Sequence, residues 1–164
     1  MFISKLKAHC ALEFQASQMY LAVSIAASQA GYFGLSKWCV GEAQDEIYHG
    51  NVILSLIRDV YGVDYSIKSA TYETPTVEDF GALIEILLNG EIAVANSITE
   101  LLKDGDCLAM SDLLYLGNNQ RDSIRKLREL YKQITSASGD EGALQAIDKS
   151  LENNYVITRC PEPI

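Results

Sequence analysis

Apolar residues recur every three to four positions in five segments of the chain, a period typical of amphipathic helices. The segments span about 4–30, 35–61, 77–104, 107–135 and 141–153. The alternating pattern of β-strands is nearly absent. Turn-forming residues fill the breaks, with Gly31 and Gly34 after the first segment, and Thr76 precedes the third as an expected helix cap. The pattern therefore predicts an all-α fold of four long helices and a short fifth helix.

The connection between the second and third segments, Gly62 to Pro75, is far longer than a hairpin needs. A helix of about 27 residues is about 40 Å long, and about 14 extended residues reach roughly 45–50 Å. The connection can therefore run back along the whole bundle. We expect the second and third helices to be parallel, as in a four-helix bundle with one long crossover.

Composition narrows the range of functions. The 164 residues are 48% hydrophobic, which fits one folded domain over 1–164, with the bundle at about 4–135 and a tail at 154–164. A net charge of −9 disfavours a nucleic-acid partner and favours attraction of cations. Lys5 and Lys7 interrupt the apolar residues at the start, so we expect no signal peptide, no membrane span and a cytoplasmic protein. The four cysteines form no Cys-x-x-Cys pair, and we expect reduced, packed thiols.

The inward-facing stripes of the first three helices each carry an acidic residue near the middle. The acids are Glu13 in the first helix, Glu46 in the second and Glu91 in the third, and the second stripe also carries His49. Glu46 and His49 lie at i and i+3, on one helix face, where oxygen and nitrogen ligands can bind one transition metal. Because an unpaired buried carboxylate costs several kcal/mol, acids converging from three helices repel one another unless a cation lies among them. The stripes therefore predict a metal site.

The polar run in the fourth helix allows two registers. One turns Asn119 and Asp122 inward, and the other turns Gln120 and Ser123 inward. Only the second continues into an apolar stripe, formed by Leu127, Leu130 and Ile134. We therefore expect Gln120 to face the core, where its amide oxygen is a weak ligand.

Five stretches, in order along nearly the whole chain, resemble the motifs of non-haem ferritins. They are Leu12–Leu21, Glu46–His49, Glu91 with Asn96–Leu101, Asn119-Gln120, and Ala146–Lys149. The resemblance implies a ferritin-like bundle and a cage of about 24 identical subunits. It also implies oxidation of Fe(II) to Fe(III) by oxygen or peroxide, and storage of ferric mineral inside the cage.

The resemblance further implies a ferroxidase centre with two iron ions per subunit. Glu13, Glu46 and His49 correspond to the ligands of one iron, and Glu46, Glu91 and Gln120 to those of the other, so that Glu46 bridges the two. Tyr20 corresponds to a tyrosine beside the centre, which either hydrogen-bonds a ligand or donates an electron.

Other positions depart from the relatives that the chain resembles. Bacterial ferritins often have a third iron site, whose counterparts here are Asp45, Asn119, Asp122 and Ser123; only two of these are acidic. We therefore expect a weak or absent third site and a centre closer to the animal heavy-chain type. Glu42, one turn before Glu46, is either an accessory iron position or a partly solvated acid, so Glu42, Asp45 and Asp122 are weaker metal candidates.

The haem-binding and DNA-protecting relatives fit less well. The fourth helix has no second Glu-x-x-His, and no methionine lies on the second helix, so we expect no haem. The only histidines are His9 and His49, and His9 is expected at the surface or an interface. Two alternatives stay open: a storage-only ferritin without significant ferroxidase activity, and a di-iron oxidase of the same superfamily.

Overall fold

The computed structural model describes residues 1–67, 71–76, 79–137 and 139–153, and all regular structure in these ranges is helical. The helices are α1 (Phe2–Gln29), α2 (Phe33–Ser55), the π-helical turn η1 (Leu56–Val60), α3 (Phe80–Asp104), α4 (Met110–Ser136) and α5 (Glu141–Asn153). The expected all-α fold of four long helices and a short fifth is confirmed. The tail beyond 153, with Cys160, lies outside the described residues.

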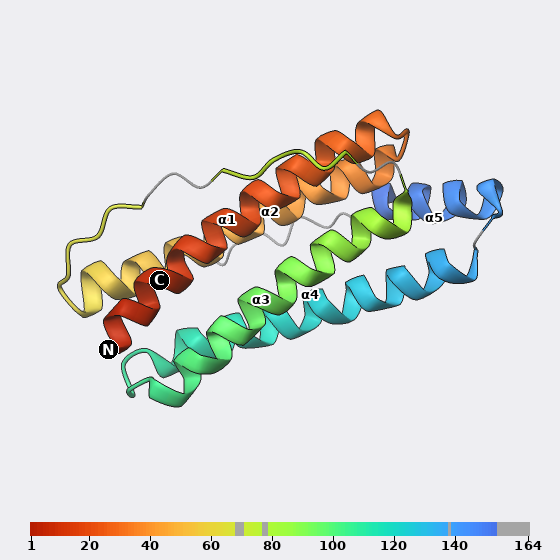
Figure 1. Ribbon diagram of the computed structural model, residues 1–164. Helices are drawn as coiled ribbons and strands as arrows, with labels where there is room; N and C mark the ends of the chain where they lie inside the picture. Colours follow the sequence, from red (N-terminus) through yellow and green to blue (C-terminus); the bar gives the residue numbers. More distant parts are fainter. Residues whose placement is uncertain (68–70, 77–78, 138, 154–164) are drawn as a thin grey trace.

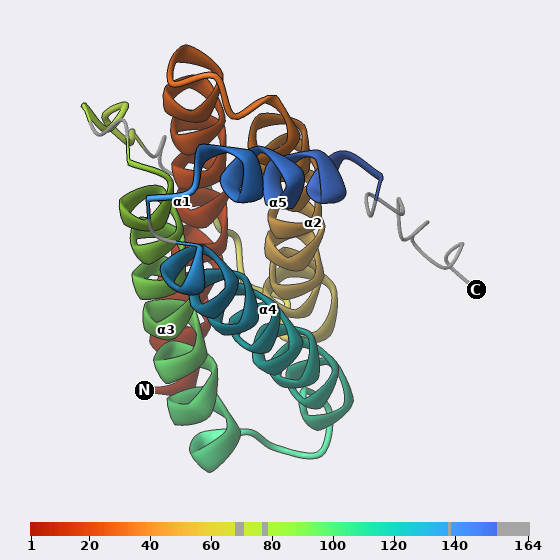
Figure 2. The same ribbon diagram turned by 90° about the vertical axis from the view of Figure 1, so that its right-hand side faces the viewer.

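The long crossover is present. Figure 1 shows α2 and η1 running to one end of the bundle, and the chain returning along its length to the start of α3. As a result α2 and α3 run in the same direction, as expected. Figure 2 shows α5 lying across one end of the bundle, where it packs against α2. By length and composition alone, α3 is the one described helix able to cross a membrane; in this fold it packs against α1 and α4.

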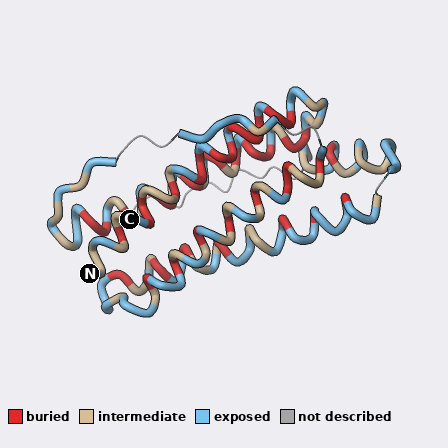
Figure 3. The backbone as a smooth tube through the Cα atoms, viewed as in Figure 1, coloured by how far each residue is buried: buried red, intermediate tan, exposed pale blue. Residues whose placement is uncertain are grey.

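Two apolar clusters fill the bundle, with buried residues lining the inward sides of the helices (Figure 3). One cluster includes Leu35, Phe80 and Leu127, and the other includes Leu6, Ile53 and Leu113. On each long helix a buried polar segment separates the two. Its residues are His9, Glu13, Ser17, Glu46, His49, Glu91 and Gln120. The fold thus brings polar side chains from four helices to one depth.

The start of α3 differs from the expectation. Its cap is Asp79, whose side-chain Oδ1 accepts a hydrogen bond of 2.8 Å from the backbone N–H of Ala82, so the expected Thr76 cap is wrong. An aspartate at this position satisfies an N–H group that has no partner within the helix. Val77 and Glu78 lie outside the described residues.

Gly34 was expected in a break but lies in the first turn of α2, where α5 docks. The side chain of Asp148 accepts hydrogen bonds from the backbone N–H groups of Gly34 (2.9 Å) and Leu35 (2.8 Å). A Cβ atom at Gly34 would lie 1.8 Å from the backbone oxygen of Asp148, so only glycine allows this approach. The turn is made instead by Gly31, at φ +87°. Asp148 therefore joins α5 to α2.

We predict that Asp148→Ala destabilises the fold by about 1–2 kcal/mol, the typical loss for a removed helix cap. For a chain of this size the expected fall in melting temperature is about 2–8 °C. The control is Gln145→Ala, at an exposed position of α5, which should change the melting temperature by less than about 1 °C. Equal melting temperatures of the two variants, measured at one protein concentration, would show that Asp148 does not cap α2.

Candidate metal centre

Glu13, Glu46 and His49 form a compact group of metal-ligating side chains in the described part of the chain. Glu13 comes from α1 and the other two from α2, and all three side chains are buried. One ligand atom from each lies within 4.8 Å of the others, and His49 Nδ1 is 3.3 Å from Glu46 Oε2. Metal bonds of about 2.0–2.2 Å place opposite ligand atoms roughly 4 Å apart. The group therefore fits one cation with little movement.

Glu91 lies in a second group with Tyr20 and Gln120. The Tyr20 hydroxyl donates a hydrogen bond to Glu91 Oε1, and Gln120 Nε2 donates to Glu91 Oε2. Gln120 Nε2 also donates to the backbone oxygen of Glu91, at 3.0 Å. The structure thus brings Gln120 to the core, in the expected register. Its amide nitrogen, rather than the expected oxygen, faces Glu91, so binding a cation through the oxygen requires the amide to turn.

The buried acids are costly when charged. Burial raises the pKa of Glu13, of Glu46 and of Glu91, and neighbouring carboxylates raise those of Glu46 and Glu91 further. The charge of Glu46 reaches the second group, where it raises the pKa of Glu91 and that of Tyr20. Glu46 therefore links the two groups electrostatically. A cation between them would remove the cost of ionising these acids.

The surroundings of the centre shift the pKa values of its two histidines in opposite directions. Burial opposes the charged form of His49, but its hydrogen bond to Glu46 and the charges of Glu46 and Glu13 outweigh burial and raise its pKa to about 9. Burial lowers the pKa of His9 to about 4, so the His9 ring is neutral at pH 7. Without metal, the imidazolium of His49 therefore supplies the positive charge that the acids need. A metal ion binding there must displace that proton.

The weaker candidates lie at the edge of the centre. Glu42 is half-buried, and burial raises its pKa to about 7 despite the opposing charge of Lys126. Asp45 is also half-buried. Asp122 is exposed, with its carboxylate 3.4 Å from the guanidinium of Arg125, so it does not join the buried group.

Among the counterparts of a third iron site, Asn119 contacts the buried group. Its Nδ2 atom lies 3.5 Å from His49 Nε2. Ser123 is half-buried and offers a hydroxyl rather than a carboxylate. A weak or absent third site stays a prediction.

His9 was expected at the surface or at an interface, and that expectation is wrong: its side chain is fully buried inside the bundle. Its Nε2 atom lies 3.0 Å from Glu13 Oε1, and its Nδ1 atom lies 3.0 Å from Ser97 Oγ on α3. The sequence held a signal for this, because His9, Glu13 and Ser17 follow one another at intervals of four residues, on one helix face.

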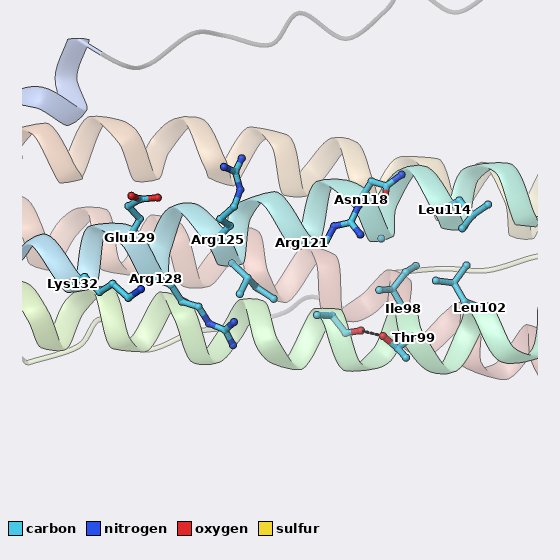
Figure 4. Close-up of a pocket in the computed structure, with 13 residues that line it drawn as sticks. Ile98, Thr99, Leu102, Leu114, Asn118, Arg121, Arg125, Arg128, Glu129 and Lys132 are labelled. Atoms are coloured by element: carbon cyan, nitrogen blue, oxygen red, sulfur yellow. Dashed lines mark hydrogen bonds between the residues drawn. The ribbon is translucent and has the colours of Figure 1, made fainter.

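A separate groove has a different character. A groove of about 710 Å³ lies between α3 and α4, and its α4 side carries Arg121, Arg125, Arg128 and Lys132 (Figure 4). None of the expected ligands lines it. Four cationic side chains repel Fe(II), so we do not assign this groove to iron.

Comparison of the sequence with known proteins identifies one matching family. The sequence model of the Ferritin family, described as a ferritin-like domain, matches residues 3–108. No curated protein sequence matches the chain.

Several solved structures share the fold. An open-pore ferritin from the hyperthermophilic archaeon Archaeoglobus fulgidus is 18% identical, with a TM-score of 0.86 over 92% of this chain and 94% of that chain. A PmFTN variant soaked in iron overnight is 19% identical, with a TM-score of 0.83 over 90% and 98%. A humanized archaeal ferritin is also 19% identical, with a TM-score of 0.85 over 92% and 93%. At these identities the structures show that the fold is shared.

Proposed function

The chain belongs to the ferritin family, and from that premise we propose that it oxidises Fe(II) at a di-iron ferroxidase centre inside each subunit and stores the ferric product as mineral. One observation carries this proposal. Buried acids from α1, α2 and α3 meet at one depth of the bundle, together with His49 and Gln120. Because such acids repel one another when ionised, they are far better suited to hold cations than to stabilise an empty core.

Iron is the substrate of this proposed centre. Glu13, Glu46 and His49 would hold one Fe(II), and Glu46, Glu91 and Gln120 would hold a second, with Glu46 shared. Two ferrous ions each give up one electron, and these two electrons, with two protons from solvent, reduce oxygen to hydrogen peroxide or hydrogen peroxide to water. Carboxylate ligands favour the harder ferric product. Tyr20 holds Glu91 in place through its hydroxyl.

The neutral Gln120 makes the proposed centre asymmetric. A di-iron cofactor that stays bound is typically held by two Glu-x-x-His motifs, one on each of two helices. Here α4 offers Gln120 and, three residues on, Ser123. The weaker ligand set favours iron that binds, reacts and leaves, and therefore favours a ferritin over a di-iron oxidase that retains its metal.

Storage requires an enclosed space, and we propose a homo-oligomeric cage of about 24 subunits in the cytoplasm. The solved ferritins share the fold of this chain over nine-tenths of its length. A net charge of −9 per subunit, repeated around a shell, concentrates cations near it. The proposed reaction needs no haem and no nucleic-acid or membrane partner.

We predict that iron added in excess under air stays soluble and co-migrates with a large particle. A cage of 24 chains of 18.1 kDa has a mass of about 430 kDa. The measurement is size-exclusion chromatography with light scattering and iron analysis of each fraction. A storage-only ferritin would show the same particle but slow iron uptake. Precipitation of the iron, with protein eluting as a monomer or dimer, would contradict the storage proposal.

A further inference from the structure

His9 is a fully buried imidazole that the proposed di-iron centre does not use as a ligand. It lies one turn before Glu13 on α1, and its two ring nitrogens have different neighbours. Nδ1 is 3.0 Å from the hydroxyl of Ser97 on α3, and Nε2 is 3.0 Å from Glu13 Oε1. The ring therefore spans the space between α3 and a proposed iron ligand on α1.

The geometry places His9 behind Glu13 rather than around the same cation. The ligand atoms of Glu13, Glu46 and His49 lie within 4.8 Å of one another, and His9 is not part of that group. Its contact with the group is through Glu13 Oε1. The other oxygen of that carboxylate, Oε2, is buried and has no hydrogen-bond partner among the described residues, so it is the oxygen left for a metal ion.

The neighbours of His9 also decide which nitrogen carries the proton. A carboxylate only accepts hydrogen bonds, so Nε2 must carry hydrogen to bond Glu13. Nδ1 then has a lone pair, and the Ser97 hydroxyl donates to it. In the structure the Nε2–H is not yet aligned with Oε1, and no other described side chain offers Nε2 a partner. At 3.0 Å, a small turn of the two side chains would complete the bond, which a buried nitrogen needs.

We propose that His9 is a positioning residue for the iron ligand Glu13. Ser97 holds the ring, the ring holds Glu13 Oε1, and Oε2 is thereby presented to the iron that Glu46 and His49 also bind. Outer partners of this kind orient metal ligands, and their loss typically weakens metal binding by about 10–100-fold. The inference rests on the proposed function for the identity of the site, but it concerns metal binding and can be tested without oxidation.

The test uses Co(II), which binds carboxylate and imidazole ligands and does not react with oxygen under these conditions as Fe(II) does. Co(II) binding to the assembled wild-type protein and to variants is measured by calorimetry and visible absorption. We expect His9→Leu, which fills the space without a donor, to weaken the tighter Co(II) site by about 10–100-fold while the number of bound ions stays the same. His9→Gln keeps a donor and should restore the affinity to within about 3-fold of wild type.

Ser97→Ala tests the other end of the arrangement and leaves the imidazole in the core. It should weaken Co(II) binding in the same direction as His9→Leu, but less. Its matched control is Thr99→Ala, because Thr99 is exposed on the same helix and its hydroxyl bonds only the backbone oxygen of Ala95 among the described contacts. Thr99→Ala should bind Co(II) as wild type does. If His9→Leu fails to fold, the comparison of Ser97→Ala with Thr99→Ala decides.

Two results would overturn the positioning role. One is Co(II) affinity of His9→Leu, or of Ser97→Ala, equal to wild type. The other is loss of one bound ion in His9→Leu without rescue by glutamine, which would make His9 a ligand itself. Failure of the proposed function looks different: wild type would then bind Co(II) in the expected way but would not oxidise iron. Wild type that binds no Co(II) would overturn the positioning role as well.

Discussion

Glu46→Gln should abolish the fast phase of iron oxidation and, at the same time, make the metal-free protein more stable. The glutamine keeps the shape of the side chain, and its oxygen can still accept the hydrogen bond from His49 Nδ1. It removes the one carboxylate proposed to bind both irons. We expect the initial rate to fall by about 100-fold or more, because loss of an outer partner alone typically costs about 10–100-fold.

The expected gain in stability of Glu46→Gln follows from the burial of the Glu46 side chain. Burial raises the pKa of Glu46, which means that the folded protein resists ionisation of this group. Each unit by which a pKa is raised costs about 1.4 kcal/mol at a pH above it. We therefore expect metal-free Glu46→Gln to unfold with a free energy on the order of 1–2 kcal/mol higher than wild type at pH 8.

The control for Glu46→Gln is Glu85→Gln, which makes the same chemical change at an exposed position of α3. It should leave the oxidation rate unchanged and stability within about 0.5 kcal/mol of wild type. Stopped-flow absorbance and thermal melts in chelator are the measurements. Unchanged fast oxidation in Glu46→Gln would remove Glu46 from the centre; a large loss of stability would mean that its charge helps to hold the empty bundle together.

The metal-free protein should lose stability as pH rises from 6 to 9, and bound metal should reverse that trend. An acid with a raised pKa binds more protons when folded than when unfolded. Its contribution to stability is therefore largest below the unfolded value and is lost as pH rises to the folded value. For Glu42 that window runs from 4.5 to about 7. Glu13, Glu46 and Glu91 shift in the same direction because of burial.

His49 adds to the loss of stability between pH 6 and 9, and His9 does not oppose that loss. The pKa of His49 is raised to about 9, so its stabilising charge is present below 6.5 and is lost between 6.5 and 9. The pKa of His9 is lowered to about 4, so its effect falls between 4 and 6.5. Across pH 6 to 9 the described buried groups therefore act together. We expect a loss of roughly 2–4 kcal/mol, since one pKa unit corresponds to about 1.4 kcal/mol.

Bound metal should reverse the change of stability with pH, because its ligands must be deprotonated. With saturating Co(II), stabilisation should grow with pH, as more of the carboxylates and His49 are available to bind. The measurement is the melting temperature at pH 6, 7.5 and 9, in chelator and in Co(II), at one protein concentration. A metal-free melting temperature that stays constant or rises from pH 6 to 9 would contradict the electrostatic description of the centre.

The sequence predicted most of the fold because both helix formation and the crossover leave local signals. The apolar period located the helices to within about three residues, and the length of Gly62 to Pro75 required a crossover. The stripe through Leu127 and Leu130 turned Gln120 inward, and the structure buries it. These features depend on spacing within one segment, which a sequence displays.

The features that were missed depend on contacts between distant segments. Gly34 resembles a turn residue until α5 is in place and Asp148 approaches it from 114 residues away. His9 follows the helical spacing of Glu13 and Ser17 on α1, but that spacing does not show that Ser97 on α3 is its partner. The orientation of the Gln120 amide is set by Glu91 and its backbone oxygen, across two helices. No pattern within a single segment carries this information.

The most direct test of the di-iron proposal is the amount of iron that one subunit oxidises in the fast phase. Fe(II) is added anaerobically in increasing ratios, oxygen is then mixed in, and the amplitude of the fast ultraviolet change is recorded. The paired centre built from Glu13, Glu46, His49, Glu91 and Gln120 predicts an amplitude that rises to two irons per subunit and then stays constant. An amplitude that stops at one iron per subunit, or shows no fast phase, would contradict it.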